Sequence, residues 1–344
     1  MRKNKQNKSF YSITMIAMLS LFVFACEFGG GGGGSDGGGG ELGTSGNPFL
    51  VDSAETLQKI LSEEDDLSLS AHYKQEVDIV LTDANWIPIG SSSKPFTGTY
   101  NGNNKKISKL KIDAPSSNNL GLFGYIGAGG TVKNLGLEEV EINGGNNVGS
   151  VAGTSSGTVE NCYVTGDVKS NSIVGGLVGE NHGVVQNCYS SCSITGGDYI
   201  GGVVGYNYGT VLNCYAVGII SGDDCVGGVV GFSNGTVQNC VALNPEVKGS
   251  SDIGRVVGMG SSRVNNYARS DMKVNGSTLT STNENSKDGT DLLSTKYYDP
   301  SWWTDTAKWS FGETDVWNAP SGTTLPTLKN MLTGDQNPTV QPVP

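Results

Sequence analysis

Short apolar segments alternate with glycine and asparagine along the middle of the chain, at a constant interval. The dipeptide Asn-Cys occurs four times at a spacing of 26 residues, first at Asn161-Cys162 and last at Asn239-Cys240. An apolar, glycine-containing segment precedes each copy in phase, from Val148-Gly-Ser-Val-Ala-Gly153 onward. A constant repeat of this length, built from short β-branched runs, indicates a solenoid rather than a globular core.

Within each unit, bends at glycine and asparagine separate three short strands. Coils of constant length with apolar strands bury their side chains only against neighbouring coils, which favours an all-β parallel β-helix. Asparagine at a repeated bend tolerates left-handed backbone geometry, and stacked amides can hydrogen-bond along the stack. Strand alternation predicts that Cys162 and Val164 point inward and that Tyr163 points outward.

Changes in composition along the chain divide it into regions. An amphipathic pattern over 53–61 predicts a helix across the N-terminal end of the solenoid, where it would cover an open strand edge. Four of the five tryptophans lie between 291 and 330, and this concentration predicts an aromatic plug at the other end. We therefore expect a signal peptide (1–25), a lipidated Cys with a poly-Gly linker (26–45), an N-terminal cap with the first coils (46–112), repeats (113–268), a loop and C-terminal cap (269–330) and a disordered tail (331–344).

The N-terminus predicts export. A basic start, an apolar run from Ile13 to Ala25 and the junction Ala25-Cys26 have the layout of a secretory signal peptide. The junction resembles the lipobox of bacterial lipoproteins, which implies acylation of Cys26 and anchoring to a membrane, expected to be the outer membrane at the cell surface. A plain signal peptide with an incidental cysteine is the alternative.

Charge and cysteines restrict the partners and the redox chemistry. Residues 1–25 hold four of the 22 Lys and Arg and no acid, so the rest carries 18 bases against 33 acids, a net of −15. This excess disfavours nucleic acid as a partner. Four of the remaining six cysteines share one repeat position, which favours a ladder of buried thiols over disulfides. Pairing of Cys192 with Cys225 stays open.

The unit V-G-G-L-V-G-x-N-x-G-x-V-x-N-C-Y closely resembles the GLUG repeat of bacterial surface proteins. The segments Asn85-Trp-Ile-Pro-Ile-Gly90 and Phe96-Thr-Gly-Thr-Tyr-Asn-Gly102 resemble the start of that family. The resemblance implies a right-handed parallel β-helix on exported proteins, often beside adhesins and IgA-specific metallopeptidases, and it implies no reaction. The chain contains only His72 and His182, and no His-Glu-x-x-His zinc motif.

Two repeat positions are candidates for binding. Four tyrosines would form an outward ladder that suits sugar rings or a protein partner, unless they merely shield the wall: Tyr163, Tyr189, Tyr215 and Tyr267. Asp198 and Asp224 align on neighbouring coils and are weak candidates for a cation, although a solvated acidic corner explains them better. The Gly-x-x-Gly strand is apolar on both faces, so its outer face should be covered by the chain itself, a second protomer or a receptor.

These features favour a non-enzymatic, lipid-anchored, adhesin-like surface protein that binds glycans or host or partner proteins by repeated weak contacts, without a cofactor. The alternatives are a carbohydrate-active β-helix enzyme and a structural spacer or assembly subunit. Ligand identity and oligomeric state do not follow from the sequence.

Overall fold

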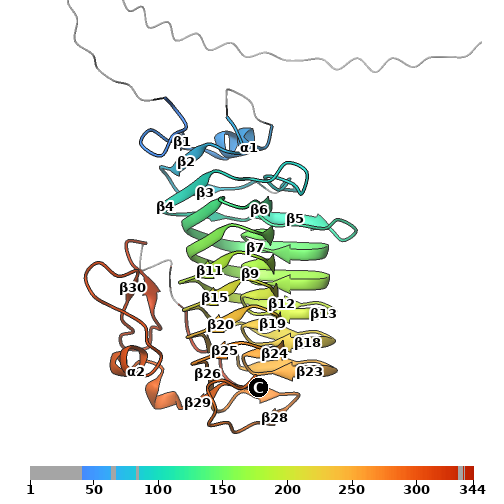
Figure 1. Ribbon diagram of the computed structural model, residues 1–344, viewed down its shortest axis with the longest axis vertical. Coiled ribbons are helices and arrows are strands. Elements are labelled where there is room, and N and C mark those ends of the chain that lie inside the picture. Colours follow the sequence, from blue (N-terminus) through green and yellow to red (C-terminus); the bar gives the residue numbers. More distant parts are fainter. Residues whose placement is uncertain (1–40, 63–66, 83–84, 332–335, 337) are drawn as a thin grey trace, which may run out of the picture. The chain divides into compact units, whose positions relative to one another are not determined.

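The computed structural model describes residues 41–331 except 63–66 and 83–84, together with 336 and 338–344. Parallel strands stack in about nine turns of about 26 residues each (Figure 1). The predicted all-β parallel β-helix is therefore confirmed. Cys26, the signal peptide and nearly all of the glycine linker lie outside the described residues.

The strands line the walls of the solenoid and pair almost entirely in parallel. One wall is a six-stranded sheet made of β6 (Phe123–Ile126), β8 (Ala152–Ser155), β10 (Val178–Asn181), β14 (Val204–Asn207), β19 (Val230–Ser233) and β24 (Val257–Gly260). The larger sheet forms the other walls. Its early members are β1 (Phe49–Val51), β2 (His72–Gln75), β3 (Ile79–Val80), β4 (Thr99–Ser108), β5 (Lys111–Ala114), β7 (Thr131–Gly149) and β9 (Thr158–Gly175).

Later coils of the larger sheet break into shorter strands at the corners. Three columns of stacked strands carry most of the side chains discussed below. The first column contains β11 (Val184–Gln186), β15 (Thr210–Leu212), β20 (Thr236–Gln238) and β25 (Arg263–Val264), and the second contains β12 (Tyr189–Thr195), β16 (Tyr215–Ala216), β21 (Val241–Ala242), β26 (Tyr267–Arg269) and β29 (Thr290–Leu292). The third contains β13 (Asp198–Gly201), β18 (Asp224–Gly227) and β23 (Ser251–Gly254). The remaining short strands are β17 (Ile220–Ser221), β22 (Glu246–Lys248), β27 (Lys273–Val274) and β28 (Ser277–Thr278).

The register of one repeat puts equivalent residues of successive coils beside each other. Val185 pairs with Val211, and Val211 pairs with Val237. All three valines are fully buried, so the interior is a stack of matched β-branched side chains. The apolar Gly-x-x-Gly segment does not have two apolar faces as expected, because the chain turns a corner between β9 and β10 and thereby directs Val174, Leu177 and Val178 all into the core.

An asparagine ladder runs up one corner of the solenoid, as the repeated Asn predicts. Each rung has positive φ, for example 50° at Asn213, and each amide hydrogen-bonds to its neighbours. The Asn213 side chain donates to Asn187 Oδ1 (3.2 Å) and accepts from Asn239 Nδ2 (3.1 Å). The ladder also includes Asn134, Asn161 and Asn265. The same residue type therefore satisfies both the backbone conformation and the side-chain hydrogen bonds of the corner.

Replacing Asn213 by Ala should destabilise the chain by about 2–3 kcal/mol. The change removes two amide hydrogen bonds at about 1 kcal/mol each and leaves a Cβ-bearing residue without local support in the left-handed region. Asn213→Gly loses the same bonds without the conformational penalty, so its loss should be smaller by about 1 kcal/mol. Urea unfolding followed by circular dichroism measures both variants, and equal losses would contradict the assigned role of backbone conformation.

A second ladder, of cysteines, lies inside the wall. All six described cysteines are buried and free, which confirms the predicted thiol ladder and excludes a Cys192–Cys225 disulfide in this structure. Cys188 Sγ donates to the Gln186 carbonyl (3.0 Å), and Cys214 and Cys240 repeat this contact one coil apart. Burial raises the pKa of the Cys188 and Cys240 thiols and raises the pKa of Cys192 to about 12.

The folded chain should therefore resist thiol alkylation at pH 8. Buried thiols do not meet the reagent, and the raised pKa values of Cys188, Cys192 and Cys240 also keep those three from supplying the thiolate that reacts. Mass spectrometry after iodoacetamide treatment should find the six described cysteines unmodified under native conditions and all modified in 6 M guanidinium (a condition of roughly full denaturation for most domains). Rapid native modification of Cys188 or Cys214 would contradict the interior position of the ladder.

Different segments close the two ends of the stack. Helix α1 (Ala54–Ser62) lies at the N-terminal end, as predicted, with Ser53 Oγ accepting from Thr56 N (3.1 Å) and with Leu57 and Ile60 fully buried (Figure 1). At the other end, the polar stretch expected to be a loop is the cap. The Lys287 carbonyl accepts from the amides of Val256 and Val257, and the backbone of 284–290 thereby occupies the open strand edge.

The tryptophan-rich segment is not an end plug, which corrects the predicted aromatic C-terminal cap. Residues 294–331, here termed the C-terminal cover, comprise a 3-10 turn (Ser294–Lys296), α2 (Pro300–Asp305), β30 (Trp317–Asn318) and β31 (Thr327–Leu328). The cover lies beside the strand stack (Figure 1), and Trp303, Trp309 and Trp317 are buried in a second hydrophobic cluster against the wall.

The expected disordered tail is wrong for the described residues beyond the cover. Gln336 is 1% exposed, and its Oε1 accepts from the Leu328 amide (2.7 Å). Further on, the Gln341 carbonyl accepts from Arg269 Nη1 (2.7 Å). These backbone and amide contacts carry no hydropathy signal, which explains why composition alone suggested disorder. Among the described residues, no helix has the length and apolar character needed to cross a bilayer.

Candidate functional site

The tyrosine ladder stacks on the outside of the wall, as predicted, but its rings are not exposed to solvent. Ring centroids of Tyr163 and Tyr189 lie 5.2 Å apart, and those of Tyr189 and Tyr215 lie 4.9 Å apart and nearly parallel. Tyr163, Tyr189 and Tyr215 are at most 2% exposed and Tyr267 is 8% exposed. The expectation that these four tyrosines contact a ligand is therefore wrong in this structure, because their outer face is already occupied.

The chain itself occupies that face. The Tyr215 hydroxyl donates to the Pro326 carbonyl (2.7 Å), and the Tyr267 hydroxyl contacts the Thr306 carbonyl (3.3 Å). Trp309 Nε1 donates to the Asn239 carbonyl (2.9 Å), which fixes the cover to the asparagine corner. Burial raises the pKa of Tyr189 and Tyr215, consistent with neutral hydroxyls beneath the cover. The ladder shields the wall, as in the alternative stated above.

A different group of aromatic rings remains at the surface, on and beside the six-stranded sheet. This aromatic patch consists of His182, Tyr199, Tyr206, Tyr208 and Phe232. Tyr208 is 47% exposed, His182 is exposed and the other three are half-buried. Centroid distances are 4.8 Å for His182–Tyr208, 4.6 Å for Tyr206–Tyr208 and 4.7 Å for Tyr206–Phe232. The rings brace one another, so the patch is preorganised.

The repeat register explains how distant residues meet in the patch. Tyr206 pairs with Glu180 on one side and with Phe232 on the other, because β10, β14 and β19 are neighbours. Tyr199 enters from the adjacent corner, where six successive coils each have a residue with positive φ. That column reads Asn119, Asn147, Ile173, Tyr199, Cys225 and Asp252. An aromatic residue is unusual in this conformation, and such strain is characteristic of functional positions.

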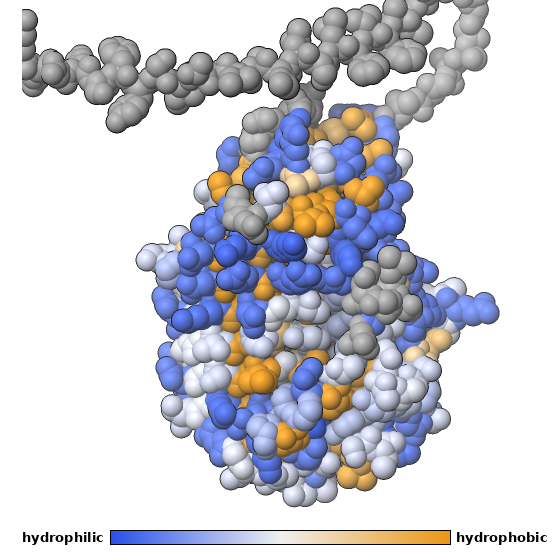
Figure 2. Space-filling view, turned by 180° about the vertical axis from the view of Figure 1, so that it is seen from behind, coloured by the Kyte–Doolittle hydropathy of each residue, from blue (hydrophilic) through white to orange (hydrophobic). Residues whose placement is uncertain are grey.

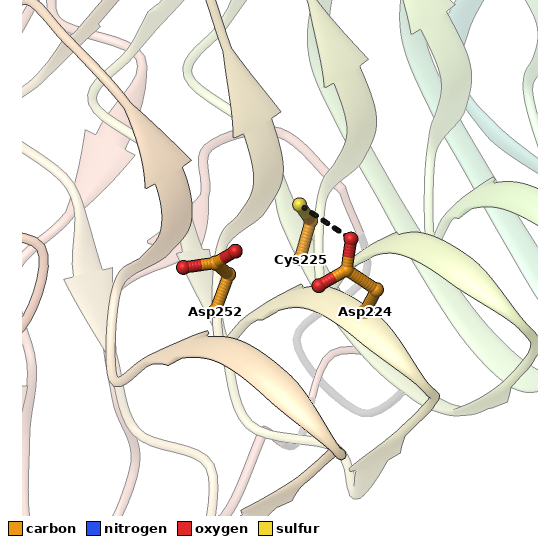
Figure 3. A group of neighbouring side chains, drawn as sticks. All are labelled: Asp224, Cys225 and Asp252. Atoms are coloured by element: carbon orange, nitrogen blue, oxygen red, sulfur yellow. Dashed lines mark hydrogen bonds between the residues drawn. The ribbon is translucent and has the colours of Figure 1, made fainter.

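Carboxylates border the patch on the same corner. Asp224 and Cys225 lie on β18 and Asp252 lies on the neighbouring β23, with their ligand-type atoms within 4.8 Å of one another (Figure 3). Asp224 accepts from Ser251 Oγ (2.5 Å) and from Cys225 Sγ (3.4 Å). The Ser251 hydrogen bond lowers the pKa of Asp224, whereas burial and the Asp224 contact raise the pKa of Cys225 to about 12.

This trio has limited capacity for a metal ion. Asp224 joins Cys225 and Asp252, rather than the Asp198 expected as its partner from repeat phase. Calcium requires six to eight oxygen ligands, and the trio offers two carboxylates. A thiophilic ion requires a thiolate, and the raised pKa of Cys225 opposes its formation at neutral pH. The geometry is better suited to attracting a cationic group from outside, which agrees with the solvated acidic corner.

The features that the repeats share do not reveal the aromatic patch. Its signal lies in the positions where repeats differ. Aligning coils by 26 residues shows Thr154, Glu180, Tyr206 and Phe232 at one position, and the strand register adds Met259 after a step of 27 residues, on strands whose flanking valine and glycine barely change. Neighbouring coils that vary only at outward positions, and vary towards aromatics, indicate a surface with its own role.

Comparisons with known proteins support the architecture more than the activity. No family model matches the chain. The chain is 38% identical over 142 residues to halomucin of Haloquadratum walsbyi, and 34% identical over 131 residues to a putative Gly-rich membrane protein of Evansella cellulosilytica. These matches cover 38% and 36% of this chain, but only 2% and 15% of the two relatives.

The fold is also found among solved structures. The crystal structure of a putative immunoglobulin A1 protease from Bacteroides ovatus matches with a TM-score of 0.66 over 83% of this chain and 94% of that one. The two sequences are 22% identical. At this level the likeness shows the shared fold, and fold alone carries no reaction.

Proposed function

We propose that the protein is a non-enzymatic, adhesin-like binding scaffold that is anchored at the cell surface through Cys26 and presents one lateral face to glycans or partner proteins. The observation that carries the proposal is the aromatic patch: the chain covers its tyrosine ladder with its own C-terminal segment but leaves a preorganised cluster of rings at the surface. Exposed aromatic groups on a rigid wall are typical of recognition surfaces.

The relatives support the location. One is named a halomucin and the other a membrane protein. The repeat resemblance, the signal-like N-terminus and the glycine linker agree with a body held off a membrane by a flexible tether. The protease named above supports no catalytic role for this chain, whose two histidines form no zinc motif.

A binding panel tests the proposal. The full chain, purified in non-ionic detergent, is incubated with immobilised polysaccharides and matrix polypeptides, and the supernatants are assayed for released sugars and peptides. Saturable binding without release supports a scaffold. Time-dependent release that scales with protein concentration contradicts it and favours the carbohydrate-active enzyme, whereas no binding to any member favours a spacer.

A further inference from the structure

We propose that the aromatic patch, together with the acidic corner beside it, is a docking site for a basic polypeptide segment rich in Lys or Arg. The inference rests on the proposed binding function and narrows it to one class of partner. The acidic corner is defined here as Asp198, Asp224 and Asp252, which lie on three successive coils of the wall.

The orientation of the rings argues against sugar stacking. Sugars pack on open ring faces, but in the patch the faces are turned to one another. The His182 and Tyr208 rings lie 9° from parallel, and the Tyr206 and Tyr208 rings lie 26° from parallel. Contacts among the rings of His182, Tyr206 and Tyr208 therefore occupy ring faces that a sugar would need. The aliphatic stems of Lys and Arg pack well on ring edges while their charged heads reach past them.

Charge complementarity identifies the groups that would pair with the charged ends of the Lys and Arg side chains. Within the described part of the chain, no Lys or Arg forms an ion pair with any of the three acidic-corner carboxylates. Their negative charge reaches the patch: the pKa of the Tyr199 hydroxyl is raised first by burial, next by Cys225, and then by Asp198 and Asp224. Glu180, which holds His182 at 3.0 Å, adds a fourth carboxylate. A cationic partner would neutralise an existing repulsion.

Charge favours a basic segment over a second copy of this chain. Figure 2 shows apolar residues in small separate patches between hydrophilic ones on the face that it presents, so that face offers no broad apolar interface. A second copy of this chain would bring a second acidic corner and a net charge of the same sign. Carboxylates on successive coils, roughly 4.8 Å apart, can be reached by the side chains of one extended segment.

Two matched pairs of variants test the site, with fluorescein-labelled octa-arginine as the probe and anisotropy as the readout on the full chain. Tyr206 and Tyr125 occupy the same outward column three coils apart, and Thr154 stands between them in that column. Tyr206→Thr should weaken binding by about tenfold or more, as for a central aromatic contact, whereas Tyr125→Thr should leave it unchanged.

The second pair of variants separates the effect of the acidic corner on binding from the effect of the net charge of the chain. Replacing Asp198, Asp224 and Asp252 by Asn should weaken binding by at least about tenfold, and the same charge change at three exposed distant acids (Asp167→Asn, Asp305→Asn and Glu313→Gln) should have little effect. Equal losses in the two triple variants, or no loss in Tyr206→Thr, would reduce octa-arginine binding to the general acidity of the chain and overturn the site.

Tyr199→Asn changes the site without the risk that the variant misfolds. Asn stands at the equivalent strained position in two earlier coils, so this variant should fold with unchanged or higher stability while its octa-arginine affinity falls. If cellohexaose binding were lost in Tyr206→Thr while octa-arginine binding persisted, the patch would belong to sugars: the inference would fail and the scaffold function would stand. If the wild-type chain bound no member of the wider panel, the proposed function itself would fail.

Discussion

Replacing Trp309 by Ala is expected to destabilise the C-terminal cover by about 3–5 kcal/mol, the cost typical of emptying a buried Trp site. Trp309 is 2% exposed, and its ring lies 4.8 Å from Trp303 and 4.6 Å from Trp317. Its indole also donates the hydrogen bond to the Asn239 carbonyl, which would be left without this partner. No other described tryptophan side chain combines central packing in the cover with a direct bond to the asparagine ladder.

In Trp309→Ala, the C-terminal cover should unfold before the solenoid does. Four of the five tryptophans lie in the cover, so tryptophan fluorescence reports its release, and far-ultraviolet circular dichroism reports the solenoid. In Trp309→Ala the fluorescence transition should move to much lower urea than the dichroism transition. Trp302→Ala is the matched control, because Trp302 is half-buried at the rim and should lose about half as much or less. Equal effects of the two changes would contradict a central role for Trp309.

Removing the charge of Asp291 is expected to cost about 3–5 kcal/mol, because it leaves a buried cation without its counter-ion. The Arg255 side chain is fully buried, and its Nη1 lies 2.7 Å from Asp291 Oδ1. Its guanidinium also donates to the carbonyls of Leu279 and of Gly289, and Gly289 belongs to the backbone (284–290) that closes this end of the stack. Arg255 therefore joins the last full coil to the cap that closes it.

The double variant provides the decisive control. Asp291→Asn alone leaves the Arg255 guanidinium without its counter-ion. Asp291→Asn combined with Arg255→Met removes both charges and keeps an unbranched side chain of comparable length at position 255. Replacing both members of a buried pair is often nearly neutral, so the double variant should be more stable than the single one by urea unfolding. A double variant as unstable as the single one would show that the packing of Arg255, rather than its charge pair, closes the end.

The sequence predicted the solenoid well because every coil repeats the same physical solution. Asn213 satisfies a left-handed corner, Cys214 fills the interior beside it, and Tyr215 points out of the wall. The same triplet recurs at 161–163 and 187–189, and the fourth copy keeps the Asn and Cys but has Val241 in place of the tyrosine. Arg255 occupies a repeat glycine position, and its side chain joins the last full coil to the residues that close it, since the end of a stack needs contacts that the repeats do not provide.

The cover and the end cap were predicted in the wrong places because their contacts are not periodic. The polar stretch around Lys287 caps the stack through backbone carbonyls, which leave no pattern in the sequence. Conversely, apolar residues indicate that a segment is buried but do not indicate which surface it packs on. Trp303 and Trp309 were therefore predicted to close the end of the solenoid rather than to pack on the tyrosine ladder. Outward-facing Val217 and Leu243 on that wall were the available signal.

Oxidative footprinting of the tyrosines tests the central claim most directly, namely that the chain covers one aromatic face and leaves another to bind partners. Hydroxyl radicals react with a ring in proportion to its exposure, and one native sample contains both sets. Tyr206 and Tyr208 should be oxidised readily, while Tyr189 and Tyr215 should be protected until the cover is released. Ladder tyrosines oxidised as fast as those of the patch in the native chain would contradict the account.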